Sequence, residues 1–155
     1  MKIVFSRSNT AVGFAIRTAT FSKWNHVDML FDNGDLIGAV GFRASDTWHG
    51  GVQITTLAAR LAQSNIVDHR IYSLALNDEA AAFAFARSQV GKPYDWAGVF
   101  GCLAHDRDWQ QDDAWFCSEL AAATALAGNT RLLNLNVSRI VPGALELCPF
   151  LTLVG

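Results

Sequence analysis

Residues 25–40 contain an alternating segment and a second apolar run, which are separated by a tight turn. Asn25 to Phe31 alternates apolar and polar side chains, Asp32-Asn33-Gly34 supplies turn residues, and Asp35 to Val40 returns. A period of two is typical of a half-buried strand, and a glycine in such a turn accepts a left-handed conformation. The pattern predicts a hairpin in which Phe31 pairs with Asp35. The pattern therefore predicts an antiparallel sheet in the first half of the chain.

The other periodic segments are mainly strands before residue 77 and mainly helices after it. Further strands are expected at Ile3–Phe5, Gly51–Thr55 and Val67–Leu76, and helices at residues 9–17, 79–90, 117–127 and 142–147. Residues 94–103 are expected to form a helix or a turn-rich connector, and residues 105–113 a polar loop. The fold class is therefore α+β, with a small antiparallel sheet or half-barrel first and helices second.

Composition limits the class of protein. The chain has 155 residues, of which 51% are hydrophobic and 17% charged, so we expect one compact domain over residues 1–155. A net charge of −2 gives no electrostatic basis for binding nucleic acid. Three cysteines, an odd number without a Cys-x-x-Cys pair, predict reduced thiols, no closed disulfide framework and no zinc site.

The N-terminal segment carries no targeting signal that we recognise. Arg7, Asn9 and Arg17 interrupt the first apolar run before a signal-peptide core could form. No stretch approaches the ~18 apolar residues of a membrane span. We therefore expect a cytoplasmic protein without stable membrane insertion, or one that a phage or secretion system delivers elsewhere. The oligomeric state stays open.

Cys117 is the first candidate functional residue. Leu120, Ala121, Thr124 and Leu126 follow it at helical spacing, which places the thiol on the first turn of a helix. The unpaired amide groups of a helix start favour the thiolate, which is the nucleophilic form of cysteine. The alternative is a buried structural cysteine, because free cysteine is often buried.

His26 is the best-placed partner among the four histidines. It begins an apolar-flanked strand, whereas His69 lies at a charged strand entrance and His105 lies in a polar loop. An imidazole beside a thiol takes its proton and later protonates the leaving group. Taken alone, His26 is better explained as a half-buried histidine that bonds to the backbone. Together with Cys117 it indicates a nucleophilic site that needs no cofactor.

Three segments resemble one known family. His26-Val27-Asp28-Met29 with its turn and Ile37-Gly38-Ala39 is similar to the histidine hairpin of the NlpC-type papain-fold hydrolases. Residues 91–96, Gly-Lys-Pro-Tyr-Asp-Trp, resemble that family's Gly-x-Pro-Tyr-x-Trp segment, and residues 116–120 resemble its Cys-Ser-x-Leu helix start. His49-Gly50-Gly51-Val52 resembles a Gly-Gly-Val strand of the YiiX-like branch.

The order of these motifs implies a particular branch. The histidine hairpin precedes the cysteine helix, which resembles the circularly permuted YiiX-like branch and the relatives of lecithin retinol acyltransferase. The resemblance implies a permuted papain-like fold and hydrolysis of an amide bond, in a peptide or a cell-wall stem peptide, through an acyl-enzyme on Cys117. The same pair also suits an acyltransferase, or a thioester or lipid hydrolase acting on a small acyl-containing substrate. A third alternative is a binding module with little or no activity.

One position departs from the family pattern. The family's third catalytic residue, a polar side chain, falls on Gly38, which cannot orient an imidazole. The predicted hairpin register places Asp28 opposite Gly38 and on the same face as His26. We therefore expect Asp28 to hold His26, with Gly38 leaving room for the carboxylate. The alternatives are His49, a bound water, a backbone carbonyl, or a solvent-exposed Asp28.

Other polar residues are candidates for contact with substrate. The resemblance implies that Tyr94 borders the cleft and donates its hydroxyl to the substrate, although a packed connector would explain it equally well. We also place Ser118 and His49 among the substrate-binding candidates, with the amide of Cys117 as an oxyanion donor. Acidic residues in 105–113 lack calcium-loop spacing, so we interpret that segment as a solvated loop and expect no metal.

Overall fold

A single antiparallel sheet forms the centre of the protein. The computed structural model describes residues 1–41, 50–97, 113–137 and 140–154. Six strands lie in the order β4-β3-β2-β1-β5-β6, and each neighbouring pair is antiparallel. Their bounds are β1 Lys2–Ser8, β2 His26–Leu30, β3 Leu36–Val40, β4 Gly51–Thr55, β5 Ile66–Leu74 and β6 Leu151–Leu153. The mixed α+β class and the antiparallel sheet expected from the sequence are confirmed.

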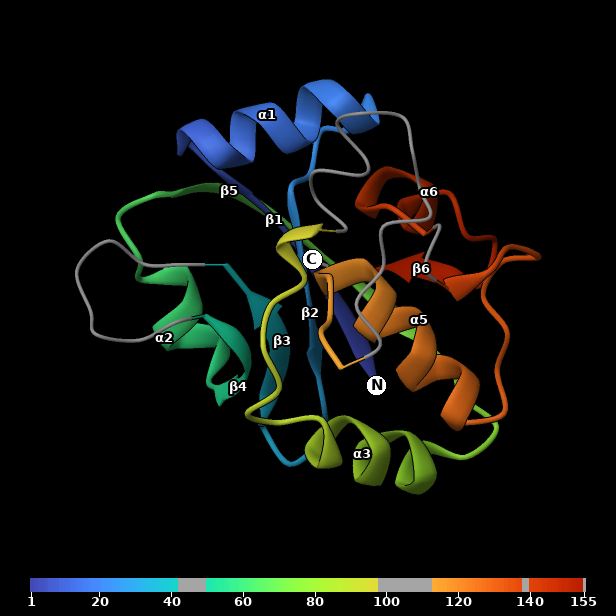
Figure 1. The fold of residues 1–155 in the computed structure, drawn as a ribbon. Coiled ribbons are helices and arrows are strands. Elements are labelled where there is room, and N and C mark those ends of the chain that lie inside the picture. The colour runs from blue at the N-terminus through green and yellow to red at the C-terminus, as the bar shows by residue number, and fades with distance from the viewer. Residues whose placement is uncertain (42–49, 98–112, 138–139, 155) are drawn as a thin grey trace.

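Helices pack around this sheet. Their bounds are α1 Ala11–Thr20, α2 Leu57–Leu61, α3 Glu79–Ser88, α5 Cys117–Ala127 and α6 Pro142–Glu146. Thr10, Thr56 and Asp78 cap α1, α2 and α3, because each side-chain oxygen accepts from a backbone N–H of the first turn. Figure 1 shows α1 beyond one end of the sheet, α3 at the other end, and α5 in front of the central strands.

The hairpin has the predicted register. The amide of Phe31 donates to the carbonyl of Asp35 at 3.0 Å, and Met29 and Leu30 pair with Ile37 and Leu36. Gly34 has a φ of +89°, a conformation that other residues rarely adopt. The side chains of residues 26 and 28 consequently share one face of β2.

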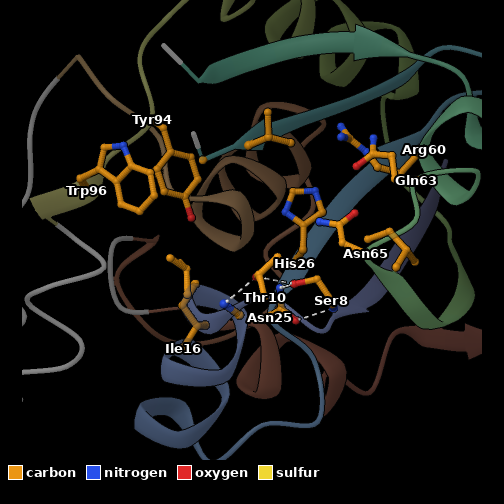
Figure 2. A pocket seen from close by; sticks show the side chains of 15 residues that line it. Ser8, Thr10, Ile16, Asn25, His26, Arg60, Gln63, Asn65, Tyr94 and Trp96 are labelled. Atoms are coloured by element: carbon orange, nitrogen blue, oxygen red, sulfur yellow. Dashed lines mark hydrogen bonds between the residues drawn. The ribbon is translucent and has the colours of Figure 1, made fainter. Parts of the chain in front are cut away.

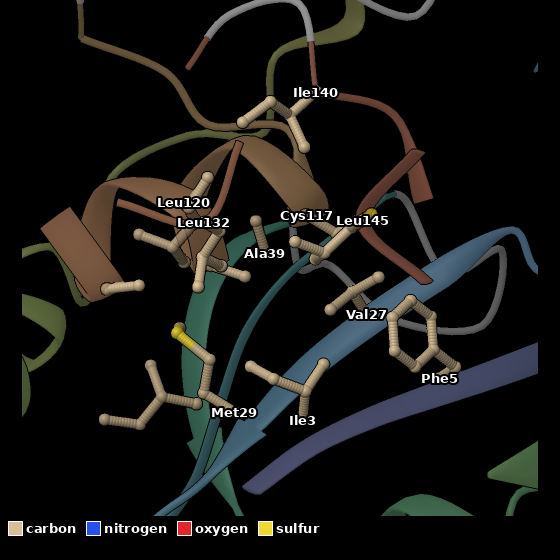
Figure 3. Packing of buried hydrophobic residues seen from close by; sticks show 14 of the residues in the cluster. Ile3, Phe5, Val27, Met29, Ala39, Cys117, Leu120, Leu132, Ile140 and Leu145 are labelled. Carbon is tan, nitrogen blue, oxygen red and sulfur yellow. The ribbon is translucent and has the colours of Figure 1, made fainter. Parts of the chain in front are cut away.

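The hydrophobic core lies between α5 and one face of the central strands. Odd-numbered residues of β1, β2 and β3 form this face, and they are Ile3, Phe5, Val27, Met29, Ile37 and Ala39. Leu120 and Ala121 of α5 are fully buried in the same cluster. Figure 3 shows Leu120 together with Met29, Ala39 and Leu132 on the sheet side of the helix. Burying a leucine side chain contributes about 2 kcal/mol to the free energy of folding, so this contact stabilises the packing of α5 on the sheet.

Two short elements were not predicted. α2 has five residues and β6 has three, and neither is long enough to show a period in the sequence. The expected connector and polar loop fall largely on residues 98–112, which lie outside the described part of the chain. No helix in the described ranges is both long enough and apolar enough to span a bilayer.

Candidate active site

His26 and Asp28 are in direct contact on β2. His26 Nε2 lies 2.9 Å from Asp28 Oδ1. The Asp28 side chain is fully buried, while that of His26 is 13% exposed. Because Nε2 faces Asp28, Nδ1 is the ring nitrogen that remains for another partner. The alternative of a solvent-exposed Asp28 is therefore wrong.

Gly38 provides the space in which the Asp28 carboxylate lies. A Cβ placed on Gly38 would overlap Asp28 Oδ1 and would lie 2.9 Å from Asp28 Cγ. Real Cβ atoms do not approach a carboxyl group so closely. The hairpin register explains this contact, because position 38 lies next to the Met29–Ile37 pair and faces position 28. Only glycine at position 38 is compatible with this placement of the carboxylate.

Arg60 of α2 is the second partner of Asp28. Its Nη2 donates to Asp28 Oδ1 at 3.2 Å, and its Nε lies 3.0 Å from Asp28 Oδ2. The arginine side chain is 3% exposed. The sequence analysis did not single out this residue, because a lone arginine in a short segment is usually solvated. The glycine at position 38 directed attention to Asp28, but no pattern in the sequence indicated that Arg60 contacts this carboxylate.

The charges of this cluster determine how it titrates. Burial lowers the pKa of His26, but the adjacent Asp28 and a hydrogen bond and charge interaction with Cys117 outweigh burial and raise the pKa to about 9. Burial raises the pKa of Asp28, yet His26 and Arg60 together hold it below its usual value of 3.8. At neutral pH the imidazole is therefore protonated and the carboxylate ionised.

Cys117 begins α5, as the sequence predicts. Phe116 precedes it in an extended conformation, and the carboxylate of Glu119 accepts from the backbone N–H of Phe116 at 3.3 Å. The ladder between β2 and β3 ends at Met29, so His26 lies beyond the last pair, where it reaches Cys117. Cys117 is 1% exposed, and Figure 3 shows it between Val27 and Leu145. The thiol is therefore buried rather than at the surface.

Backbone hydrogen bonds hold Tyr94 beside the start of α5. The amide of Trp115 donates to the carbonyl of Pro93, and the amide of Asp95 donates to the carbonyl of Trp115, both at 3.1 Å. The Tyr94 ring makes edge contacts with Trp96 and Phe116, with centroids 5.0 and 6.1 Å apart. Tyr94 therefore borders the cleft and also packs as a connector, so both interpretations of the segment describe its position.

Two other predicted substrate contacts have different outcomes. Ser118 is fully buried, and its hydroxyl donates to the carbonyl of Ile140 at 2.6 Å. This hydroxyl faces away from the cleft because it ties α5 to the segment before α6, so its placement does not support the predicted substrate contact. His49 lies outside the described residues.

A cleft of about 170 Å³ opens beside His26. Its described lining is Ser8, Thr10, Val12, Gly13, Ile16, Asn25, His26, Val40, Gly41, Arg60, Gln63, Asn65, Ile66, Tyr94 and Trp96. Figure 2 shows the imidazole between Asn65 and Arg60 on one side and Tyr94 on the other. Cys117 does not contribute to this lining. The sequence analysis missed Gln63 and Asn65, because isolated amides in a connector carry no pattern.

The donor set offers no evident metal site. No group of three or more histidine, cysteine, aspartate or glutamate side chains suitable for a metal ion occurs within the described ranges. Both oxygens of Asp28 already face Arg60, whose positive charge opposes a cation at that place.

The chain is similar in fold to a solved structure. No protein-family model and no curated protein matches the chain. Among solved structures, it is similar to the crystal structure of metalloprotein yiiX from Escherichia coli O157:H7, with a TM-score of 0.70 and 20% sequence identity. The alignment covers 99% of this chain and 94% of the other. At this identity the likeness establishes a shared fold and nothing further.

Proposed function

We propose that the protein is a permuted papain-like cysteine hydrolase that cleaves an amide bond through an acyl-enzyme on Cys117. The observation that carries the proposal is the position of His26, which contacts Asp28 through Nε2 and interacts electrostatically with Cys117. A nucleophile, a base and a group that orients the base are the parts that such chemistry requires.

The proposed reaction follows from these contacts. The reactive state is the ion pair in which His26 holds the proton of Cys117, and the thiolate adds to the substrate carbonyl carbon. The backbone N–H of Cys117 lies on the first turn of α5, without a partner inside the helix, and would stabilise the oxyanion. The C–N bond then breaks while His26 gives its proton to the leaving amine. Neutral His26 next removes a proton from water, which hydrolyses the thioester and frees the thiol.

The cleft limits the substrate. Its described lining combines neutral polar groups with apolar side chains and contains no carboxylate, and the only guanidinium there, Arg60, is paired with Asp28. Such a surface suits an uncharged amide-containing or acyl group. It provides no negative charge that would bind a protonated amine. A small peptide or a peptidoglycan fragment would present its backbone to Asn65 and Gln63, whose amides can both donate and accept.

The likeness to a metalloprotein does not extend the proposal to a metal. The described residues lack a suitable ligand cluster, and Arg60 occupies the Asp28 carboxylate. The proposed reaction therefore uses only groups of the protein itself.

Acylation by p-nitrophenyl acetate tests the proposal. We expect a burst of nitrophenolate close to one equivalent per protein, with an acetyl group on Cys117 by peptide mass spectrometry. Cys117→Ser and His26→Ala should abolish the burst, whereas Cys148→Ser should keep it. Cys148 is a matched control because it is also buried, and its thiol donates to the carbonyl of Leu132. Absence of acetyl on Cys117 in the wild-type protein would refute the hydrolase.

A second candidate is a binding module without catalysis. The 1% exposure of Cys117 favours it, because a nucleophile must reach its substrate. Iodoacetamide labelling separates the two candidates. Labelling faster than that of a free thiol near neutral pH, and lost in His26→Ala, supports the enzyme. Labelling slower than that of a free thiol supports the module.

An acyltransferase would share the acyl-enzyme and differ in the acceptor. Product analysis with p-nitrophenyl acetate in the presence of added alcohols or amines separates the two activities. If water is the natural acceptor, acetate should remain the main product. An acyltransferase should give mainly the acetylated alcohol or amine.

A further inference from the structure

Arg60 reaches the catalytic cluster from an element that has no other part in it. α2 follows β4 and has only five residues, Leu57–Leu61. The Arg60 guanidinium is nevertheless buried against Asp28. Asp28 Oδ1 lies 2.9 Å from His26 Nε2 and accepts a hydrogen bond from Arg60 Nη2 at 3.2 Å. One carboxylate oxygen is therefore shared between a base and a permanent cation.

The proposed reaction redistributes charge within the cluster while its sum stays zero. In the ion pair from which the proposed acylation starts, imidazolium, thiolate, carboxylate and guanidinium sum to zero. In the acyl-enzyme the sulfur carries no charge, and His26 must be neutral to activate water. The buried Asp28 would then stand without a counter-charge if Arg60 were absent.

We propose that Arg60 is a positioning residue that holds Asp28 and shares its charge, so that His26 can release its proton in the acyl-enzyme. This inference rests on the proposed function. Among the described residues, the charged and titratable groups facing His26 are Asp28 on the same strand, Cys117 on α5, Arg60 on α2 and Tyr94 across the cleft. Arg60 is the member of this set that opposes the imidazolium.

The expected effect of losing Arg60 has a definite sign. A charge within ~4–6 Å shifts a neighbouring pKa by about 1–3 units, so removal of the guanidinium lets Asp28 retain the proton on His26 more firmly. The neutral imidazole required for deacylation becomes at least about tenfold rarer near neutral pH. Acylation, which begins from the ion pair, is less affected.

Burst kinetics with p-nitrophenyl acetate and an NMR titration of the His26 Hε1 proton test the proposal together. Arg60→Met should keep the burst amplitude of the folded protein, lower the steady-state rate at least about tenfold, and move the His26 titration above about 9. Arg60→Lys, which restores a charge without the forked contact, should recover part of the steady-state rate. Arg87→Met is the matched control, because Arg87 is 55% exposed and lies 3.6 Å from Asp35.

The outcomes separate the two levels of the proposal. Equal loss of burst and steady-state rate, with the His26 titration unmoved, would make Arg60 a structural residue only and overturn the inference. If Arg60→Met does not fold, the same measurements on Arg60→Lys decide between these results. A wild-type protein without a burst refutes the hydrolase, and in that case the His26 titration still shows whether Arg60 opposes the imidazolium.

Discussion

The Asp28 carboxylate occupies the volume that a side chain at position 38 would fill. A Cβ on Gly38 would lie 2.9 Å from Asp28 Cγ, so the two positions of the hairpin cannot both carry side chains at this place. The polar partner of His26 therefore comes from its own strand, and the glycine across the hairpin is a requirement of that arrangement.

Gly38→Ala should displace Asp28 from His26. We expect a loss of stability of about 1–3 kcal/mol from overpacking, because the carboxyl group is buried and already held by Arg60. The pKa of His26 should fall from about 9, since its carboxylate moves away. Urea unfolding and the NMR titration of His26 measure the two effects.

Gly34→Ala is the control on the same hairpin. A Cβ there meets nothing within 4 Å, but the φ of +89° makes the substitution strained. It should lower stability through the backbone and leave the His26 titration unchanged. If Gly38→Ala also leaves that titration unchanged, the spatial relation between Gly38 and Asp28 has no electrostatic consequence.

Asp28→Asn should weaken both the site and the fold. Arg60 would remain buried with a neutral partner, and breaking a buried ion pair typically costs about 3–5 kcal/mol. The pKa of His26 should fall, and acylation of Cys117 should slow with it. Asp68→Asn is the matched control, because Asp68 is partly exposed and pairs with Lys23 at 2.9 Å. An acylation rate equal to wild type in Asp28→Asn would end the role given to this carboxylate.

Stability should depend on pH through His26. Its pKa rises from 6.5 to about 9 on folding, so its contribution is complete below about 6.5 and is lost as the pH rises through about 9. The shift corresponds to about 3 kcal/mol. Asp28 acts in the opposite direction, because its lowered pKa gives stability that is lost only in acid.

Urea midpoints at about pH 6 and about pH 10 measure this dependence. His26→Gln should remove most of the difference between the two midpoints, whereas His69→Gln should not, because His69 is exposed. A wild-type midpoint that does not fall toward alkaline pH would contradict the ion pair.

Two buried hydroxyls on α5 should respond differently to removal. Ser118 donates to the carbonyl of Ile140, so Ser118→Ala leaves a buried acceptor without its partner and should cost about 1–3 kcal/mol. Thr124 Oγ1 is buried and makes no hydrogen bond within the described structure, so Thr124→Val should be neutral or stabilising. Urea unfolding measures both. Slower acylation in folded Ser118→Ala would restore the substrate role for Ser118 that its position does not support.

Local pattern was sufficient for most elements. Alternation located β2, short apolar segments located β1, β3, β4 and β5 within a few residues, and the hairpin turn set which side chains share a face. Asp78 and the glycine after α3 marked its ends, and Pro142 marked the start of α6. The likeness to yiiX agrees with the YiiX-like branch to which the motifs pointed, at the level of the fold.

What the sequence determined alone was the face-sharing of His26, Asp28 and Gly38 and the place of Cys117 at a helix start, because short-range periodicity and turn geometry decide both. The tertiary structure decided that Arg60 contacts Asp28, that the Ser118 hydroxyl donates to the carbonyl of Ile140 and that Cys117 is buried. These contacts join residues far apart in the chain, and their geometry depends on how helices pack on the sheet, which no local pattern specifies.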